Sequence, residues 1–199
     1  MNPKFAGALI AAAVLAAGAA VAQSGAPEMT PEQKAQAEAW AKAGTPGTEH
    51  ATLAKSAGEY DIKVKSWMEP GAPPMEDSGT ASRKMDLDGR VLVEEVHSTM
   101  MGQPFMGHGM MGYDNVTGKY WSTWNDNMST ALFVSAGSCD AKNVCSFKGT
   151  MTDPMTKKQQ TTRMTTKWTS PNVEVFEMYG PDPKGKEFKM MEITYTKKG

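Results

Sequence analysis

The sequence predicts an all-β protein, an antiparallel up-and-down meander barrel of about ten strands with a short N-terminal helix. From Gly58 onward, apolar and polar residues alternate in short runs that are rich in Val, Thr, Tyr and Trp. Turn residues separate these runs, and no helical period interrupts them. So many consecutive strands favour closure, because closure removes exposed edges. A two-sheet sandwich is the alternative that the pattern leaves open.

The N-terminus has the features of a secretory signal peptide. Lys4 supplies a positive charge, residues 5–19 form an apolar run, and residues 20–22 read Ala-Val-Ala, which predicts cleavage between Ala22 and Gln23. We therefore expect a periplasmic or secreted protein. The expected organisation is a signal peptide at 1–22, a leader with N-terminal helices at 23–57, and a β-barrel domain at 58–199.

Helix signals follow the leader. Thr30 is a good N-cap, Pro31 suits the first helical position, and Gln33 completes a capping box. Gly44 predicts the end of this helix. Its apolar side is mostly alanine with Trp40 as the one large anchor, so we expect it to pack loosely on the domain. A second, shorter helical segment is expected at residues 50–57.

The strands are placed by alternation between turn signals such as Asp88-Gly89 and Asp153-Pro154. The expected strands are 60–65, 78–87, 90–101, 105–113, 119–125, 130–138, 144–151, 159–168, 173–179 and 187–196.

The two cysteines, Cys139 and Cys145, flank a polar turn between two of these strands. Export would place them in an oxidising compartment, where thiols pair. We therefore expect a disulfide across the hairpin that adds about 2 kcal/mol of stability, because the closed loop is short.

Several function classes find no support. The formal net charge is −1 and there is no basic patch that would suit nucleic acid. After the signal peptide, no apolar run is long enough to span a bilayer. No phosphate-binding loop or nucleophile motif is present, and no histidine follows His108 to ligate haem from the late strands. Glu94 and Glu95 are adjacent on a strand, so they point to opposite faces and do not form an acid–base pair. We assign no catalytic residues.

The stretch 97–112, HSTMMGQPFMGHGMMG, holds two of the three histidines and five of the 17 methionines. Thioether and imidazole groups suit Cu(I). A two-residue turn at Gln103-Pro104 would place the possible ligands on one face, whereas a three-residue turn from Gly102 would split them. These possible ligands are His97, Met101, Met106, His108 and Met110. Methionine is also frequent elsewhere in the chain, which favours the alternative that this stretch fills or lines the barrel.

A second notable stretch is rich in aromatic residues. Tyr120, Ser122, Trp124 and Asp126 should share one strand face, with Trp121 on the other. If that face points inward, it offers an aromatic wall with a few polar groups, which suits a small-molecule pocket. The expected pocket residues are Tyr60, Met100, Phe105, Tyr113, Trp124 and Phe133.

The segment Leu53 to Tyr60 resembles the L-x-x-x-x-G-x-W opening of lipocalin-type, or calycin, barrels, with Tyr60 in place of the tryptophan. From about residue 29 to the C-terminus the chain resembles a bacterial family of exported proteins, domain-of-unknown-function family 1579, within that barrel group. The matching pieces are Met29 to Gln33, Gly44 to Gly47, Pro70 to Pro74, Met101 to Phe105, Gly112 to Asn115, Trp124 to Asp126 and Lys189 to Ile193. The resemblance implies a calycin-like barrel and no particular activity.

The sequence therefore favours an exported, non-catalytic protein that binds a small, partly apolar ligand inside a β-barrel without a cofactor. The first alternative is a periplasmic protein that binds copper as Cu(I), or another soft metal, through the Met/His hairpin. The second is an enzyme of unknown reaction. The sequence does not indicate the oligomeric state.

Overall fold

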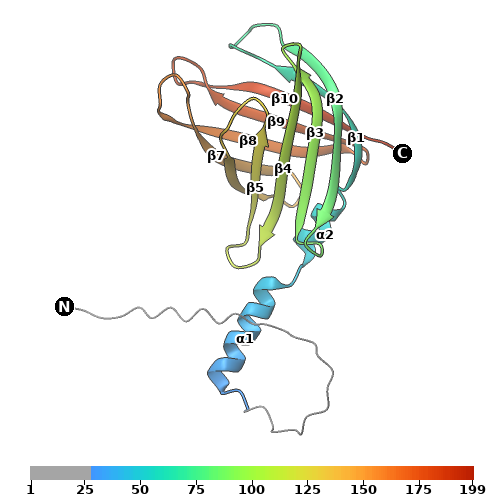
Figure 1. Ribbon diagram of the computed structural model, residues 1–199, viewed down its shortest axis with the longest axis vertical. Helices are drawn as coiled ribbons and strands as arrows, with labels where there is room; N and C mark the ends of the chain where they lie inside the picture. The colour runs from blue at the N-terminus through green and yellow to red at the C-terminus, as the bar shows by residue number, and fades with distance from the viewer. Residues whose placement is uncertain (1–27) are drawn as a thin grey trace, which may run out of the picture.

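The computed structural model describes residues 28–199, which form two helices followed by ten strands (Figure 1). The predicted signal peptide and its cleavage site lie outside the described residues. The elements are α1 (Pro31–Gly44), α2 (Thr48–Ala54), β1 (Gly58–Ser66), β2 (Met75–Asp86), β3 (Val91–Met100), β4 (Gln103–Asp114), β5 (Lys119–Asp126), β6 (Phe133–Cys139), β7 (Cys145–Thr152), β8 (Gln159–Ser170), β9 (Val173–Pro181) and β10 (Glu187–Lys197).

The ten strands form a closed antiparallel barrel in which each strand pairs with the next along the chain. The closing pair joins β1 to β10, with a register that runs from Tyr60 opposite Lys197 to Ser66 opposite Met191. This closure confirms the up-and-down barrel and excludes the sandwich. The predicted strands are all present, although β2 begins at Met75 and β4 at Gln103, earlier than the alternation alone indicated.

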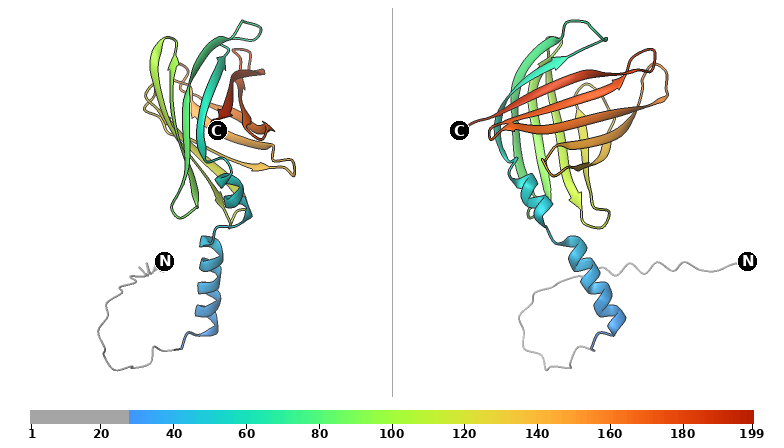
Figure 2. Two further views of the ribbon diagram at one scale, coloured as in Figure 1. Left: turned by 90° about the vertical axis from the view of Figure 1, so that its right-hand side faces the viewer. Right: turned by 180° about the vertical axis from the view of Figure 1, so that it is seen from behind.

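Helix α1 begins as predicted, with the Thr30 capping box and Pro31 in the first turn. However, it extends away from the barrel and contains no buried residue, and Trp40 is 72% exposed (Figures 1 and 2). The expectation that Trp40 anchors this helix to the domain is therefore wrong. The physical reason is that its other apolar residues are alanines, which offer too little area to hold it against the sheet.

Helix α2 lies against one end of the barrel and buries His50 and Leu53. It begins at Thr48 rather than at residue 50, because the His50 ring Nδ1 accepts a hydrogen bond of 3.1 Å from the Gly47 amide and so caps the first turn. The His50 ring also meets the Tyr113 ring edge-on at 6.0 Å. We call this the capped end of the barrel, and the opposite end the open end.

The β3–β4 hairpin differs from both predicted turns. Met100 pairs with Gln103, so the turn residues are Met101 and Gly102. Both have positive φ angles, 53° and 76°, as a two-residue type I′ turn requires. The sequence argument failed because Pro104 suggested a turn, whereas Pro104 lies within β4, opposite Thr99.

Two hydrophobic clusters fill much of the barrel. The first lies toward the capped end and is centred on Leu53, Leu92, Tyr120, Phe147 and Met164. The second is centred on Tyr60, Ile62, Ala81, Val96 and Tyr195, on the strands next to the β1–β10 closure. Partly buried aromatic and methionine side chains surround both clusters.

Candidate ligand-binding site

An aromatic pair stands on the inner wall of the barrel. Phe105 on β4 and Trp124 on β5 are stacked, with ring centroids 6.4 Å apart and planes within 14° of parallel. Trp124 Nε1 donates a 3.0 Å hydrogen bond to Asp126 Oδ2, which fixes the orientation of the indole ring. Gly107 makes room for this ring, because a Cβ there would lie 2.2 Å from Trp124 Cζ2.

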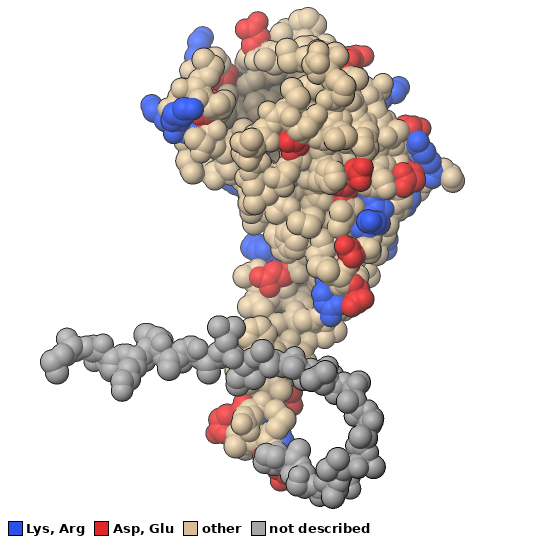
Figure 3. Space-filling model, viewed as in Figure 1, with Lys and Arg blue, Asp and Glu red and all other residues tan. Residues whose placement is uncertain are grey.

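Many inward-facing side chains are only half-buried, although they belong to the core by position. In a barrel whose interior is completely filled, such aromatic and aliphatic residues would be almost fully buried. The half-buried residues that pack around the two clusters include Phe105, Trp124, Phe133, Phe176, Met178 and Ile193. Solvent therefore reaches the inner wall, and the space-filling view shows the surface hollowed near the rim of the barrel (Figure 3).

Three charged side chains meet inside the barrel. Arg83 on β2 donates from Nε to Glu94 Oε1 on β3 at 2.7 Å, and from Nη1 to Glu174 Oε2 on β9. The other Glu174 oxygen accepts a hydrogen bond from the Thr166 hydroxyl. We refer to Arg83, Glu94 and Glu174 as the interior charge cluster. Charges this far from solvent are stable only when they are paired and hydrogen-bonded, as these are.

Two tyrosines enclose the guanidinium of Arg83. Its Cζ atom lies 4.9 Å from the centre of the Tyr60 ring and 4.2 Å from that of Tyr195. Burial opposes the charged form of Arg83, but the carboxylates of Glu94 and Glu174 outweigh it and hold the pKa of Arg83 above its usual value. Burial, reinforced by the charge of Glu94, raises the pKa of Tyr195. Arg83 therefore remains a cation inside the barrel.

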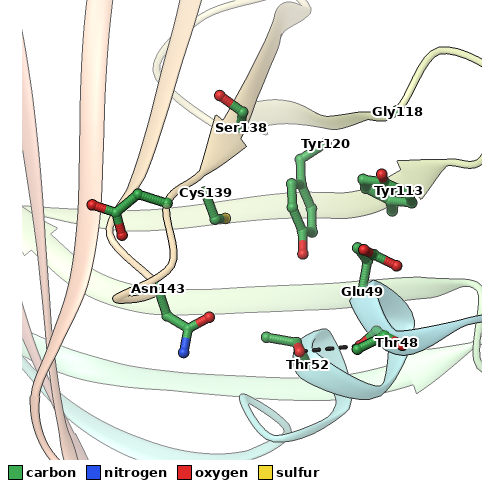
Figure 4. Close-up of a pocket in the computed structure, with 10 residues that line it drawn as sticks. Thr48, Glu49, Thr52, Tyr113, Gly118, Tyr120, Ser138, Cys139 and Asn143 are labelled. Carbon is green, nitrogen blue, oxygen red and sulfur yellow. Dashed lines mark hydrogen bonds between the residues drawn. The ribbon is translucent and has the colours of Figure 1, made fainter.

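A separate cavity of about 250 Å³ lies at the capped end, between α2, the β4–β5 turn and the β6–β7 hairpin (Figure 4). Tyr120 points its hydroxyl toward α2, and burial together with the nearby Glu49 and Tyr113 raises the pKa of Tyr120. The lining is mostly polar and consists of Thr48, Glu49, Thr52, Tyr113, Gly118, Tyr120, Ser138, Cys139, Asp140 and Asn143. Cys139 forms the predicted disulfide with Cys145, which confirms that expectation.

Comparison with known proteins supplies a family. Residues 45–197 match the family described as "Protein of unknown function (DUF1579)". The chain belongs to the DUF1579 family. The comparison with curated proteins gives no match. Among solved structures the chain is similar to a redesigned β-barrel, with 10% identity over 78% of this chain and 100% of that chain and a TM-score of 0.38.

The predicted pocket residues of this DUF1579 barrel all have inward positions, but the structure does not gather them at one place. Phe105 and Trp124 are stacked, and Met100 is the last residue of β3, beside the open end. Tyr60 is fully buried, and its hydroxyl donates to the Ser56 carbonyl at 2.7 Å. Tyr113 lies at the capped end and Phe133 packs against the first cluster. Tyr60 therefore belongs to the hydrophobic core, whereas Phe105 and Trp124 lie on the inner wall and are partly accessible to solvent.

The possible metal ligands lie mostly on the outer face of the barrel. In the observed register His97 is opposite Met106 and Glu95 is opposite His108, and all four side chains are exposed. Met110 lies two residues further along the same face and is 45% exposed. Met101 lies in the turn. Within residues 28–199, no group of three or more His, Cys, Asp or Glu side chains has the geometry of a metal site.

The interior charge cluster was not predicted. Glu94 carried a signal, because it lies between Leu92 and Val96 in the alternation of β3, where an inward residue should be apolar. No local pattern could predict the contact between Arg83 and Glu174, because 91 positions separate them in the chain.

Proposed function

We propose that this DUF1579 protein is a non-catalytic binding protein that holds a small, partly apolar ligand inside its barrel. The observation that carries the proposal is the stacked pair Phe105 and Trp124, which faces inward and is only half-buried. A barrel of this strand number has room for one small ligand when its interior is not filled by side chains. Aromatic walls with a few fixed polar groups are typical of such sites.

The methionines of the inner wall support the same proposal. Thioether side chains are flexible and polarizable, so they adapt to ligands of different outline. Met100, Met111 and Met178 have inward positions and are half-buried. The ligand would enter at the open end, since α2 covers the other end.

Binding of a neutral apolar fluorophore tests this proposal. N-phenyl-1-naphthylamine should bind saturably with one site per chain and quench tryptophan fluorescence. Phe105→Ala should weaken this binding about tenfold, which corresponds to about 1.4 kcal/mol. The matched control is Val134→Ala, which shortens an exposed apolar side chain on the neighbouring sheet surface. Absence of saturable binding by the folded wild-type protein would refute a binding barrel.

We also propose that the protein is exported. A disulfide between Cys139 and Cys145 is typical of oxidising compartments. Across residues 28–199 no helix is both long and apolar enough to cross a membrane. Expression of the full chain in a bacterial host should yield a periplasmic product whose N-terminal residue is Gln23. Retention of residues 1–22 on a cytoplasmic protein with free thiols would contradict the proposal.

Binding of Cu(I) at the outer face of the β3–β4 hairpin is the second candidate. It is favoured by one observation: His97, Met106, His108 and Met110 share one exposed face. His97 Nε2 lies 2.5 Å from Glu95 Oε1, a contact that a metal at His97 would have to replace. Competition with a Cu(I) chelator should reveal a site that the double change His97→Ala and His108→Ala removes. Equal, weak binding by both proteins would exclude it.

A further inference from the structure

The interior charge cluster has a surplus of negative charge. One guanidinium faces two carboxylates, so the formal charges of the three groups sum to −1. Lys197 on β10 also has an inward strand position, but its Nζ donates a 3.1 Å hydrogen bond to the Lys55 carbonyl at the capped end. It therefore does not neutralise the cluster.

The surplus is located on Glu94. Both oxygens of Glu174 are used, one by Arg83 and one by Thr166. Glu94 Oε1 accepts from Arg83, whereas Oε2 accepts no hydrogen bond from any residue among 28–199 and is reached by solvent. The Glu94 side chain is 17% exposed, compared with 9% for Glu174. Because Glu94 points inward, the residual exposure opens toward the barrel interior.

The cluster and the aromatic pair belong to one continuous interior. Arg83 stacks on Tyr60 and Tyr195, which are members of the second hydrophobic cluster. Phe105 and Trp124 pack against the same cluster from β4 and β5. A chain-like ligand that lies along this cluster would therefore have one end near Glu94 and its body against the aromatic pair.

We propose that the ligand is an amphipathic cation, with an ammonium or other cationic N–H head that donates to Glu94 Oε2 and an apolar body against Phe105 and Trp124. This inference rests on the proposed function and specifies its ligand class. A mostly buried carboxylate whose second oxygen has no protein donor attracts a cationic donor more strongly than a fully exposed carboxylate does. A ligand carboxylate would be repelled by Glu94 and Glu174. The charge of Arg83 would attract it little, because these two carboxylates already offset that charge.

Three ligands of equal chain length test the inference: n-decylamine, n-decanol and n-decanoate, titrated into the full chain at pH 7. Displacement of N-phenyl-1-naphthylamine would report the affinity of each. The amine should bind at least tenfold more tightly than the alcohol, and the carboxylate should bind most weakly. High salt should reduce this preference for the amine less than it weakens an exposed ion pair, because the Glu94 side chain is mostly buried.

A pair of matched variants locates the effect. Glu94→Gln should reduce the affinity for the amine to that for the alcohol and leave the affinity for the alcohol unchanged. Glu192→Gln is the control, because it removes an outward carboxylate that pairs with Lys189 on β10. It changes the net charge equally and should leave all three affinities as they were.

The outcomes separate the two proposals. If the wild-type protein binds amine and alcohol equally, or prefers the carboxylate, the ligand class is refuted while the binding barrel stands. If Glu94→Gln and Glu192→Gln weaken amine binding equally, the site is not at Glu94 and the inference fails. If none of the three ligands and no fluorophore binds, the binding barrel itself is refuted. Should Glu94→Gln fail to fold, the comparison of the three ligands on the wild-type protein decides alone.

Discussion

At the scale of single residues, two inward glycines of β4 set the position of the Trp124 ring. Gly107 and Gly109 lie on the same face of β4, and both lie under Trp124. A Cβ at Gly107 would lie 2.2 Å from Cζ2 of the indole, whereas one at Gly109 would lie 3.1 Å from Cε3. The first distance forces the ring to move, while the second requires only a small adjustment.

Gly107→Ala should therefore destabilise the protein by about 1–3 kcal/mol, as overpacking of a core does. It should also weaken binding of N-phenyl-1-naphthylamine, because the Phe105–Trp124 stack is displaced. Gly109→Ala is the matched control and should change stability far less. Urea unfolding of the three proteins measures both effects. Equal stability of the two variants would show that Trp124 does not occupy the place described.

The buried phenol of Tyr195 gives a pH dependence at the same scale. Its ordinary pKa is 10.0, and burial raises the pKa in the folded protein. The native state therefore holds this proton more tightly than the unfolded chain does. The resulting stability is complete below about pH 10 and is lost as the pH rises further, because only the unfolded phenol then ionises.

The free energy of unfolding should accordingly fall between pH 9 and 11, and Tyr195→Phe should make that fall less steep. Urea titrations at half-unit pH steps measure the slope. Tyr179→Phe is the comparison and should flatten the fall less, because burial also raises the pKa of Tyr179 but this residue lies on the outer face under Arg163 and is far less buried. An unchanged slope in Tyr195→Phe would contradict the assignment.

At the scale of elements, two hairpins show what the sequence could and could not predict. Alternation and turn residues are local signals, so they predicted the β6–β7 hairpin together with its disulfide. The β3–β4 turn was not predicted, because it places Met101, rather than a residue that favours a positive φ, at its first position. A register error of this size changes which residues face each other, although His97 and His108 share one face as the two-residue turn predicted.

The disulfide itself should stabilise the β6–β7 hairpin. Replacement of Cys139 and Cys145 by serine should lower the free energy of unfolding by about 2 kcal/mol, because the seven-residue loop in the unfolded chain is no longer closed. Wild-type protein in reducing agent should match the variant. If reduction and substitution both leave the urea midpoint unchanged, the bond contributes nothing to stability.

The α1 helix is oriented by polar contacts at its end rather than by packing. Arg90 donates from Nη2 to the Gly44 carbonyl at 2.8 Å, and Asn115 Nδ2 donates to the Thr45 carbonyl at 2.7 Å. These donors, from the β2–β3 and β4–β5 turns, satisfy carbonyls that the end of a helix leaves unpaired. The sequence predicted the helix from its own residues but could not reveal donors that come from distant turns.

At the scale of the whole molecule, closure of the barrel determines which side chains meet in its interior. The number of strands was predicted from the sequence, and closure was favoured because it covers the edges, although the pattern left a two-sheet sandwich open. The interior charge cluster could not be predicted from the sequence, because it forms only when closure of the barrel brings β9 and β10 close to β1 and β2. Half-exposure of Phe105 and Trp124 is likewise a property of the closed barrel rather than of any strand.

Removal of residues 187–199 tests the role of closure. Without β10, both β1 and β9 would have an unpaired edge, and Tyr195 would be missing from the second cluster. We expect the truncated chain to lose cooperative thermal unfolding altogether rather than to melt at a slightly lower temperature. Circular dichroism at the strand wavelength follows the transition. A truncated chain that still melts sharply would show that nine strands suffice.

The pairing of Tyr60 with Lys197 also imposes an order in time. Strand β1 can pair with β10 only after the C-terminal strand has been synthesised and has reached it. Until then, two rows of backbone amides and carbonyls stay available to any other extended chain nearby. Pairing between such distant segments is slow, on a scale of milliseconds to seconds. Before closure, these rows of β1 and β9 are therefore the part of the sheet most open to association with another chain.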